Sequence, residues 1–376
     1  MKKCLNPIIA YDNRYRVADL NNRIITREEL KTNKVKLYGW TNFLSLVKRL
    51  GKQGALDELH RDDIVLMPCR KCVNCQLNRA KEWSIRNVLE SKLYNDDERL
   101  FITLTYNDVN SSNKNNLVKI VKDKKIMYVS TLYYKDVQLF LKRLRKKYKD
   151  YNIRYYLAGE YGSHTLRPHY HILLYGLPLK AIEDIDYLYA TKNGKFYNSQ
   201  ILENLWRKGF VNITEFSEYT AMYTSQYCTK KIKDYSIEDS IEEDIHNYSL
   251  NYCLANSRAS PKDDYELLVK QEFNCMSRRP GIAHDYIITY KDDIYKNDSF
   301  LFHIDEKTYE LKPLKYYDRV YDFENPIHYK FIKENRKKFY KAYEYFEQIE
   351  SDIGLYEYFK TQEDTIKKKL SKRKGV

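Results

Sequence analysis

The sequence contains no long apolar run and little glycine or proline. No stretch approaches the roughly 18 uninterrupted apolar residues that span a bilayer. The first residues reach Asp12 and Arg14 before an apolar signal segment develops. We therefore expect a protein without membrane spans that stays in the cytoplasm where it is made. With 11 Gly and 8 Pro among 376 residues, the chain also shows no flexible linker and no internal repeat.

A nucleotide-driven motor is missing as well. The phosphate-binding pattern G-x-x-x-x-G-K-[ST] occurs nowhere in the chain. Any separation of nucleic-acid strands must therefore come from another protein.

The composition favours a folded protein with a polyanionic partner. The chain has 66 Lys and Arg against 52 Asp and Glu, a formal net charge of +14, 43% hydrophobic residues and 15% aromatic residues. This apolar content is enough for a core, so we exclude an intrinsically disordered chain, and the length favours roughly two or three domains. The basic charge suits a phosphate backbone, although charge alone does not choose among DNA, RNA and lipid.

Changes of pattern divide the chain into four predicted regions. Residues 1–95 form a cysteine-containing N-terminal module that ends in a helix over 78–92. Residues 96–235 alternate between strand and helix patterns, which predicts an α+β core with a central antiparallel sheet flanked by helices. Its expected strands are 100–106, 154–160, 169–175 and 210–214, and its expected helices are 135–148, 198–206 and 217–232. Residues 236–300 are an insertion that ends in a Ser-Arg-Arg-Pro-Gly segment, and 301–376 are a helical, basic C-terminal region.

The strongest chemical signal is the pair His169 and His171. Side chains alternate between the two faces of a strand, so both imidazoles point the same way and Tyr170 points the other way. Glu160 ends the preceding expected strand, and antiparallel pairing would bring its carboxylate beside the imidazoles. Two His and one carboxylate leave open positions where a divalent ion binds a phosphate oxygen. Two ordinary surface histidines and a solvated glutamate are the alternative.

A second constellation is Tyr223 and Tyr227, followed by Lys230 and Lys231. Residues four apart share a helix face, so both phenols point at one spot and the lysines follow within a turn. The 38 tyrosines of the chain make such spacings common, but this pair follows the histidine strand and has adjacent cations that favour a phenolate. Tyr219, one turn earlier, is a competing candidate.

The third signal is a group of cysteines at C-x-x-C-x-x-C spacing. In a cytosolic chain, Cys69, Cys72 and Cys75 argue against disulfides and for a structural metal, zinc in the first place. Cys4 is a candidate fourth ligand far upstream. Three arginines, Arg167, Arg278 and Arg279, are candidate DNA contacts because guanidinium groups suit phosphate, although a surface salt bridge explains Arg278 and Arg279 equally well.

The order of these motifs resembles the HUH endonuclease superfamily as found in rolling-circle replication initiators. The segment 101–106 comes first, then the histidine pair, then the tyrosines. Relaxases, which also carry the histidine pair, place their tyrosine first. More narrowly, the chain is similar to the replication initiators of gokushovirus-like microviruses, small single-stranded DNA phages, in segments 67–72, 159–162, 167–171 and 276–281. The resemblance covers about residues 65–285.

The resemblance implies an HUH endonuclease fold and a DNA nicking and joining reaction. His169, His171 and Glu160 would bind Mg²⁺ or Mn²⁺, Tyr223 and Tyr227 would be alternating nucleophiles, and Lys230 and Lys231 would contact phosphate. The protein would cut one strand of origin DNA in the bacterial host's cytoplasm, become linked to the 5′ phosphate and leave a 3′ hydroxyl. Host helicase, polymerase and single-strand-binding protein would complete replication.

Two other interpretations stay open. A single-tyrosine HUH transposase or plasmid initiator would use Tyr223 alone or Tyr227 alone. A non-catalytic DNA-binding or packaging protein would hold single strands by stacking and charge, with no metal requirement.

Overall fold

The structure is a computed structural model. It describes residues 4, 7–11, 38–60, 64–111, 117–122, 125–162, 167–191, 194–226, 272–304, 307–338 and 364–365. Their contacts divide the chain into two compact units, one of residues 79–317 and one that joins residues 1–78 with 318–376.

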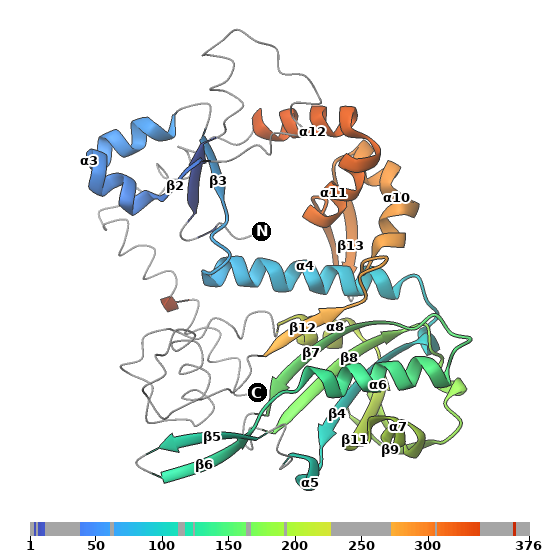
Figure 1. The fold of residues 1–376 in the computed structure, drawn as a ribbon. Coiled ribbons are helices and arrows are strands. Elements are labelled where there is room, and N and C mark those ends of the chain that lie inside the picture. The colour runs from blue at the N-terminus through green and yellow to red at the C-terminus, as the bar shows by residue number, and fades with distance from the viewer. Residues whose placement is uncertain are drawn as a thin grey trace. The chain divides into compact units, whose positions relative to one another are not determined.

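A seven-stranded antiparallel sheet forms the centre of the unit of residues 79–317 (Figure 1). Its strands in spatial order are β12 (Phe273–Met276), β7 (Arg154–Tyr161), β8 (Pro168–Tyr175), β4 (Arg99–Tyr106), β11 (Gly209–Glu215), β10 (Gly194–Ser199) and β9 (Ile185–Thr191). The predicted α+β class with a central antiparallel sheet flanked by helices is confirmed. Four of the strands match the predicted ones to within one residue at each end.

Helices α6 (Tyr134–Lys147) and α7 (Gln200–Trp206) cover one face of this sheet. The apolar side chains of α6 recur at helical spacing, so its Val137, Phe140, Leu141 and Leu144 are buried while its lysines stay exposed. Trp206 packs its ring against Tyr106, Phe140 and Tyr170. The main hydrophobic core lies between these helices and the sheet.

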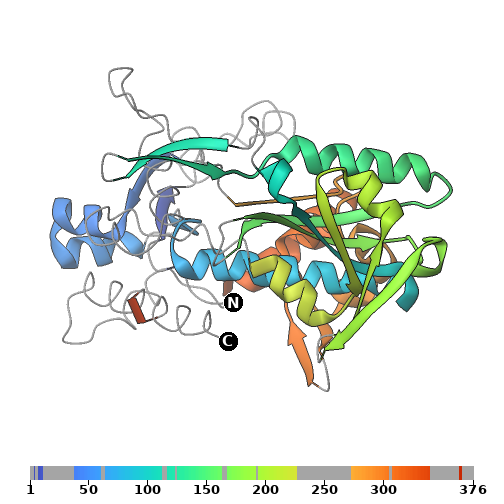
Figure 2. The same cartoon turned by 90° about the horizontal axis from the view of Figure 1, so that it is seen from below.

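Helices α4 (Val73–Ser91) and α8 (Glu218–Gln226) lie on the opposite face, as Figure 2 shows. Trp83 of α4 contacts the ring of Tyr156, and the Tyr175 hydroxyl donates to the Asn87 backbone oxygen at 3.2 Å. The Asn87 amide in turn donates to the Ser225 hydroxyl of α8 at 3.2 Å. The predicted helix over 78–92 is confirmed, and it begins five residues earlier than expected.

Several elements depart from the predicted pattern. The segment expected to begin a helix at residue 198 is still strand β10, and the strand β9 before it escaped prediction because its tyrosines are exposed on both sides of an edge strand. Strand β12 pairs with β7, so the end of the expected insertion belongs to the central sheet. The C-terminal region begins with a hairpin rather than a helix.

The remaining elements are short or lie outside the central sheet. In the larger unit they are η1 (Asp96–Glu98), α5 (Asp108–Ser111), β5 (Leu117–Lys122), β6 (Lys125–Ser130), η2 (Leu179–Ala181), α10 (His284–Lys296), β13 (Phe300–Ile304) and β14 (Lys307–Leu311). Helix α11 (Lys315–Glu324) runs from this unit into the other, which contains β1 (Ile8–Tyr11), β2 (Tyr38–Asn42), α3 (Phe43–Leu59), β3 (Ile64–Met67) and α12 (Pro326–Lys338). Among the helices described, none is both long and apolar enough to cross a bilayer.

A buried ion pair fastens the segment after β12 to the sheet and to α4. The Arg154 guanidinium on β7 lies 2.5 Å from the Glu90 carboxylate on α4, and both side chains are buried. Arg154 also donates to the backbone oxygens of Pro280 and Gly281, at 3.1 and 2.9 Å. Arg86, one turn before Glu90, donates to the Ile282 oxygen at 2.7 Å. The segment that carries Arg278 and Arg279 is thus held by charge-assisted hydrogen bonds.

We expect Glu90→Ala to lower the free energy of unfolding by about 3–5 kcal/mol, because it leaves the Arg154 charge buried without its partner. The matched control is Lys312→Ala, whose ammonium lies 3.3 Å from the Asp298 carboxylate but is 69% exposed. That change should cost less than about 1 kcal/mol. Urea titrations followed by tryptophan fluorescence would measure both values, and equal effects of the two substitutions would contradict the expectation.

Candidate active site

Strand β8 presents the two histidines on one face of the sheet. His169 and His171 point toward the side covered by α4 and α8. Tyr170 points to the α6 side, where it is fully buried and its hydroxyl accepts the Tyr133 amide proton at 2.8 Å. The predicted alternation is therefore confirmed. Burial raises the pKa of the Tyr170 phenol, so this tyrosine serves packing rather than reaction.

Strand β4 supplies a threonine opposite each histidine. Thr105 pairs with His169 and Thr103 with His171 in the antiparallel register. The Thr105 hydroxyl lies 3.2 Å from Nδ1 of His169, and the Thr103 hydroxyl lies 3.0 Å from Nδ1 of His171. Phe101 stacks on the His171 ring, with centroids 5.4 Å apart and an angle of 7° between the planes. The segment 101–106 is recognisable as a motif in the sequence, but a role for its threonines follows only from these contacts.

Glu160 reaches the histidines from strand β7. Its backbone pairs with His169, and its Oε1 lies 2.9 Å from Nε2 of His171. The side chains of Glu160 and His171 are both buried. The expected approach of this carboxylate to the imidazoles is thus seen in the structure, with its direct contact to His171. Gly162, two residues on, lies close to the other ring, since a Cβ there would come within 2.9 Å of Nε2 of His169.

Helix α8 brings a tyrosine to the same place. Its start is capped reciprocally, because the Ser217 amide donates to the Thr220 hydroxyl at 3.0 Å and the Thr220 amide donates to the Ser217 hydroxyl at 3.1 Å. The helix buries one face, which includes Ala221, Thr224 and Ser225. Tyr223 lies at the edge of the His171 ring, with centroids 5.5 Å apart, and its hydroxyl is 3.5 Å from Oε1 of Glu160.

Tyr219 and Tyr223 differ in their surroundings although they stack on each other at 6.4 Å. Tyr219 is 60% exposed, whereas Tyr223 is 36% exposed and contacts both Glu160 and His171. Of these two phenols, the structure therefore brings Tyr223 to the histidines. Tyr227, Lys230 and Lys231 lie outside the described residues.

The candidate DNA-contacting arginines occupy two places. Arg167 precedes β8, where it donates to the Tyr106 backbone oxygen at 3.2 Å and pairs with the Asp108 carboxylate. Arg278 and Arg279 are exposed in the segment that the Arg154–Glu90 pair fastens. Arg278 forms a backbone bridge with Gly281.

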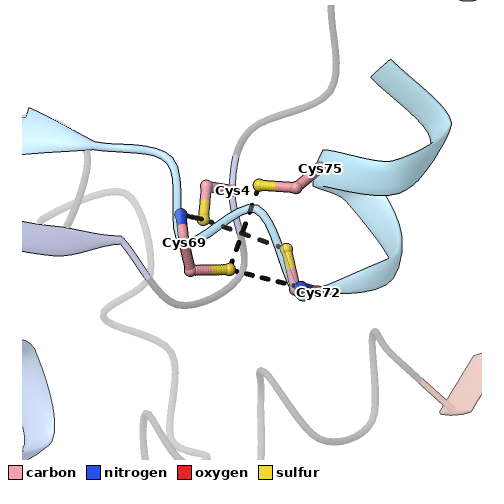
Figure 3. Close-up of side chains that lie close together, drawn as sticks. All are labelled: Cys4, Cys69, Cys72 and Cys75. Carbon is pink, nitrogen blue, oxygen red and sulfur yellow. Dashed lines mark hydrogen bonds between the residues drawn. The ribbon is translucent and has the colours of Figure 1, made fainter. Parts of the chain in front are cut away.

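The four N-terminal cysteines form a separate cluster in the smaller unit (Figure 3). Their sulfur atoms all lie within 4.8 Å of one another, although Cys4 is 65 residues from Cys69 in the sequence. The Cys4 and Cys72 sulfurs are 3.8 Å apart, and those of Cys69 and Cys75 are 3.9 Å apart. The expected convergence of Cys4 with the other three is confirmed. A metal could be held by this cluster.

The thiols of the cluster lie in surroundings that disfavour their charged forms. Hydrogen bonds with Cys69 and Cys72 and then burial raise the pKa of Cys4, and burial raises the pKa of Cys75 to about 12. Packed thiols of this kind stay protonated until a cation replaces the protons. Backbone amides also point at sulfur, since the Cys69 amide donates to Sγ of Cys4 at 3.3 Å and the Cys72 amide to Sγ of Cys69 at 3.2 Å.

Comparison with known proteins identifies relatives of this chain. The family model for the replication-associated protein ORF2 matches residues 99–232, which contain β4, β8 and α8. Replication-associated protein ORF2 of Spiroplasma virus 4 is 31% identical over 78% of this chain and 79% of its own length. Replication-associated protein VP4 of Bdellovibrio phage phiMH2K is 31% identical over 50% of this chain and 55% of its own length.

A third relative is replication-associated protein ORF4 of Chlamydia phage 1, which is 30% identical over 44% of this chain and 38% of its own length. No solved structure matches the chain. The similarity to the Spiroplasma virus protein extends over most of both chains. The chain therefore belongs to the ORF2 family of phage replication-associated proteins.

Proposed function

We propose that this replication-associated protein is a DNA nicking and joining endonuclease of the HUH type that starts rolling-circle replication of a single-stranded DNA phage genome. One observation carries the proposal. The Tyr223 hydroxyl lies 3.5 Å from a Glu160 oxygen that is itself 2.9 Å from Nε2 of His171. A candidate nucleophile thus lies beside a group of side chains that are suited to binding a metal.

We infer that His169, His171 and Glu160 would hold one divalent cation, Mg²⁺ or Mn²⁺. Imidazole nitrogen and carboxylate oxygen are suitable donors for these ions. Two ligands at right angles around an ion, with bonds of about 2.1 Å, lie about 3 Å apart. The 2.9 Å between Nε2 of His171 and Oε1 of Glu160 fits that requirement. When bound, the ion would polarise a phosphoryl oxygen and offset the charge that develops on it.

Tyr223 would attack the phosphorus of a DNA phosphodiester. The phenolic oxygen forms a bond to phosphorus and loses its proton, while the bond from phosphorus to the 3′ oxygen breaks and that oxygen gains a proton. The products are a 5′-phosphotyrosine and a free 3′ hydroxyl. The ester keeps the energy of the cleaved linkage, so rejoining needs no nucleotide cofactor. Tyr227 would perform the second transfer after one round of synthesis.

Basic side chains would hold the DNA near this centre. Lys230 and Lys231 follow the tyrosines in sequence and would contact phosphate, as would Arg167, Arg278 and Arg279. The substrate would be origin DNA, single-stranded or in the supercoiled replicative form. Host helicase, polymerase and single-strand-binding protein in the bacterial cytoplasm would supply the remaining steps.

We further infer that Cys4, Cys69, Cys72 and Cys75 bind structural zinc. Zinc–sulfur bonds of about 2.3 Å in a tetrahedron place the sulfur atoms about 3.8 Å apart. Two pairs in the structure are separated by 3.8 and 3.9 Å. Four thiolates leave no open position, so this site would stabilise the fold and take no part in the reaction.

We expect the reaction to require the histidines. Purified protein, Mn²⁺ and a pool of random single-stranded oligonucleotides should give a covalent protein–DNA band on a denaturing gel. Chelation with EDTA, His169→Ala and His171→Ala should each reduce that band by at least about 100-fold, because charge stabilisation at the phosphate is lost. His303→Ala, at an exposed histidine of β13, is the matched control and should leave the band unchanged.

The alternative, a non-catalytic DNA-binding or packaging protein, gives a different result in the same assay. It predicts salt-sensitive binding without an adduct, with and without metal, even on supercoiled replicative-form DNA. That outcome would contradict the nuclease proposal.

A further inference from the structure

The two threonines of β4 make the same contact to the two histidines of β8. In both pairs the hydroxyl meets Nδ1, at 3.0 Å for Thr103 and His171 and at 3.2 Å for Thr105 and His169. The antiparallel register places each threonine directly across from its histidine. The repeat of one geometry two residues apart shows that the alternation of both strands produces it. On both histidines, Nε2 is the ring nitrogen that the threonine does not contact.

The surroundings of Nε2 agree with this division. Nε2 of His171 lies 2.9 Å from the Glu160 carboxylate. Beside Nε2 of His169 the chain has Gly162, where any side chain would begin 2.9 Å from the nitrogen. Phe101 lies flat against the His171 ring and limits its rotation. The threonines therefore contact the edge of each ring that faces away from Glu160 and Gly162.

A hydroxyl differs from the usual partners of a metal-bound histidine. A backbone carbonyl or a carboxylate can only accept, so it fixes a proton on the ring nitrogen it contacts. A threonine hydroxyl can either donate to Nδ1 or accept from it. An ionised Glu160 only accepts, so Nε2 of His171 carries a proton in the arrangement seen here. Nδ1 of a neutral His171 must then accept from the Thr103 hydroxyl.

We propose that Thr103 and Thr105 are positioning residues that aim Nε2 of each histidine at the cation site, and that Thr103 reverses its hydrogen bond when His171 binds the cation. This inference rests on the proposed function for the cation. On binding, a proton leaves Nε2 and one is taken up at Nδ1, so the imidazole stays neutral and no net proton is released. Nδ1 then donates to the Thr103 oxygen, and the hydroxyl rotates to accept it.

The test follows the ring nitrogens directly. Protein labelled with ¹⁵N in its histidines would be studied by long-range ¹H–¹⁵N correlation NMR, first free and then saturated with Mg²⁺. The free protein should show His171 protonated at Nε2, and the Mg²⁺ form should show it protonated at Nδ1. A His171 that is protonated at Nδ1 in the free protein, or whose tautomer does not change on saturation, would overturn the exchange.

Paired substitutions test the positioning role. Thr103→Val keeps the shape of the side chain and removes the hydroxyl, whereas Thr103→Ser keeps the hydroxyl. We expect Thr103→Val to weaken Mn²⁺ binding by about 10–100-fold, measured by electron paramagnetic resonance, and Thr103→Ser to stay within about 3-fold of the parent. Thr105→Val and Thr105→Ser should behave in the same way. Equal Mn²⁺ affinity for the Val variants and the parent would overturn the role.

The outcomes separate this inference from the proposed function. If the parent protein forms the DNA adduct with Mn²⁺ but the Val variants bind Mn²⁺ equally well, only the threonine assignment fails. If the parent binds neither Mg²⁺ nor Mn²⁺, the cation site of the proposed function fails, and the tautomer exchange fails with it. Unfolding temperatures of the Val and Ser variants show whether any loss comes from the fold.

Discussion

Replacing Tyr223 and Tyr227 together with phenylalanine is expected to abolish the covalent DNA adduct, with a loss of at least about 1,000-fold. Phenylalanine keeps the ring and removes the only oxygen that can attack phosphorus. Tyr223 is 36% exposed and its hydroxyl makes a long, 3.5 Å contact, so the change should leave the fold intact. Gel quantification of adducts against the parent protein measures the effect.

The single variants and a neighbour complete this experiment. A two-tyrosine enzyme keeps some cleavage after the loss of either tyrosine alone, whereas a single-tyrosine enzyme loses all of it with one substitution. Tyr219→Phe is the matched control, because Tyr219 lies on the same helix face one turn away and is 60% exposed. Loss of the adduct in Tyr219→Phe, with retention in the double variant, would show that the nucleophile has been misassigned.

The second large effect is expected at the cysteine cluster. Cys72→Ser should remove one bound zinc per chain and destabilise the smaller unit by more than about 5 kcal/mol, since structural zinc contributes about 10–16 kcal/mol in finger peptides. Burial of Cys72 leaves little room for water to replace the thiolate. Zinc released into a chromogenic chelator and the rate of limited proteolysis are the two measurements.

Cys275→Ser is the matched control for the zinc experiment. Cys275 lies on β12 in the larger unit, where its sulfur is 3.8 Å from the Tyr134 hydroxyl and 3.9 Å from the Tyr155 hydroxyl. This substitution should retain one zinc per chain. A parent protein purified without zinc that also fails to bind added zinc would contradict the structural-zinc assignment.

Strict local periodicity was sufficient to predict the central part of the fold. Alternation in β8 placed His169 and His171 on one face, and the 3.6-residue period of α6 identified its buried residues. Glu160 was predictable because a hairpin connects its strand to β8, so a local rule fixes which residues approach each other. Cys4 was predictable from chemistry alone, as three closely spaced thiols suggest a fourth ligand.

The features that escaped prediction depend on long-range pairing. Strand β12 joins β7 across more than 100 residues of chain, and no local pattern in Phe273–Met276 specifies that partner. The Glu90–Arg154 pair joins a helix to a strand in the same way. Thr103 and Thr105 gave a readable signal, because T-x-T and H-x-H have the same period. The register between β4 and β8 was still needed to place them against the histidines.

The central claim is that a tyrosine at the histidine site becomes linked to DNA, and locating the linkage tests it most directly. The adduct formed with Mn²⁺ would be digested with nuclease and trypsin, and the nucleotide-bearing residue found by tandem mass spectrometry. The account predicts a 5′-phosphonucleotide on Tyr223 or Tyr227. A nucleotide on Tyr219 or on any other residue, or no modified peptide from a protein that binds the DNA, would contradict it.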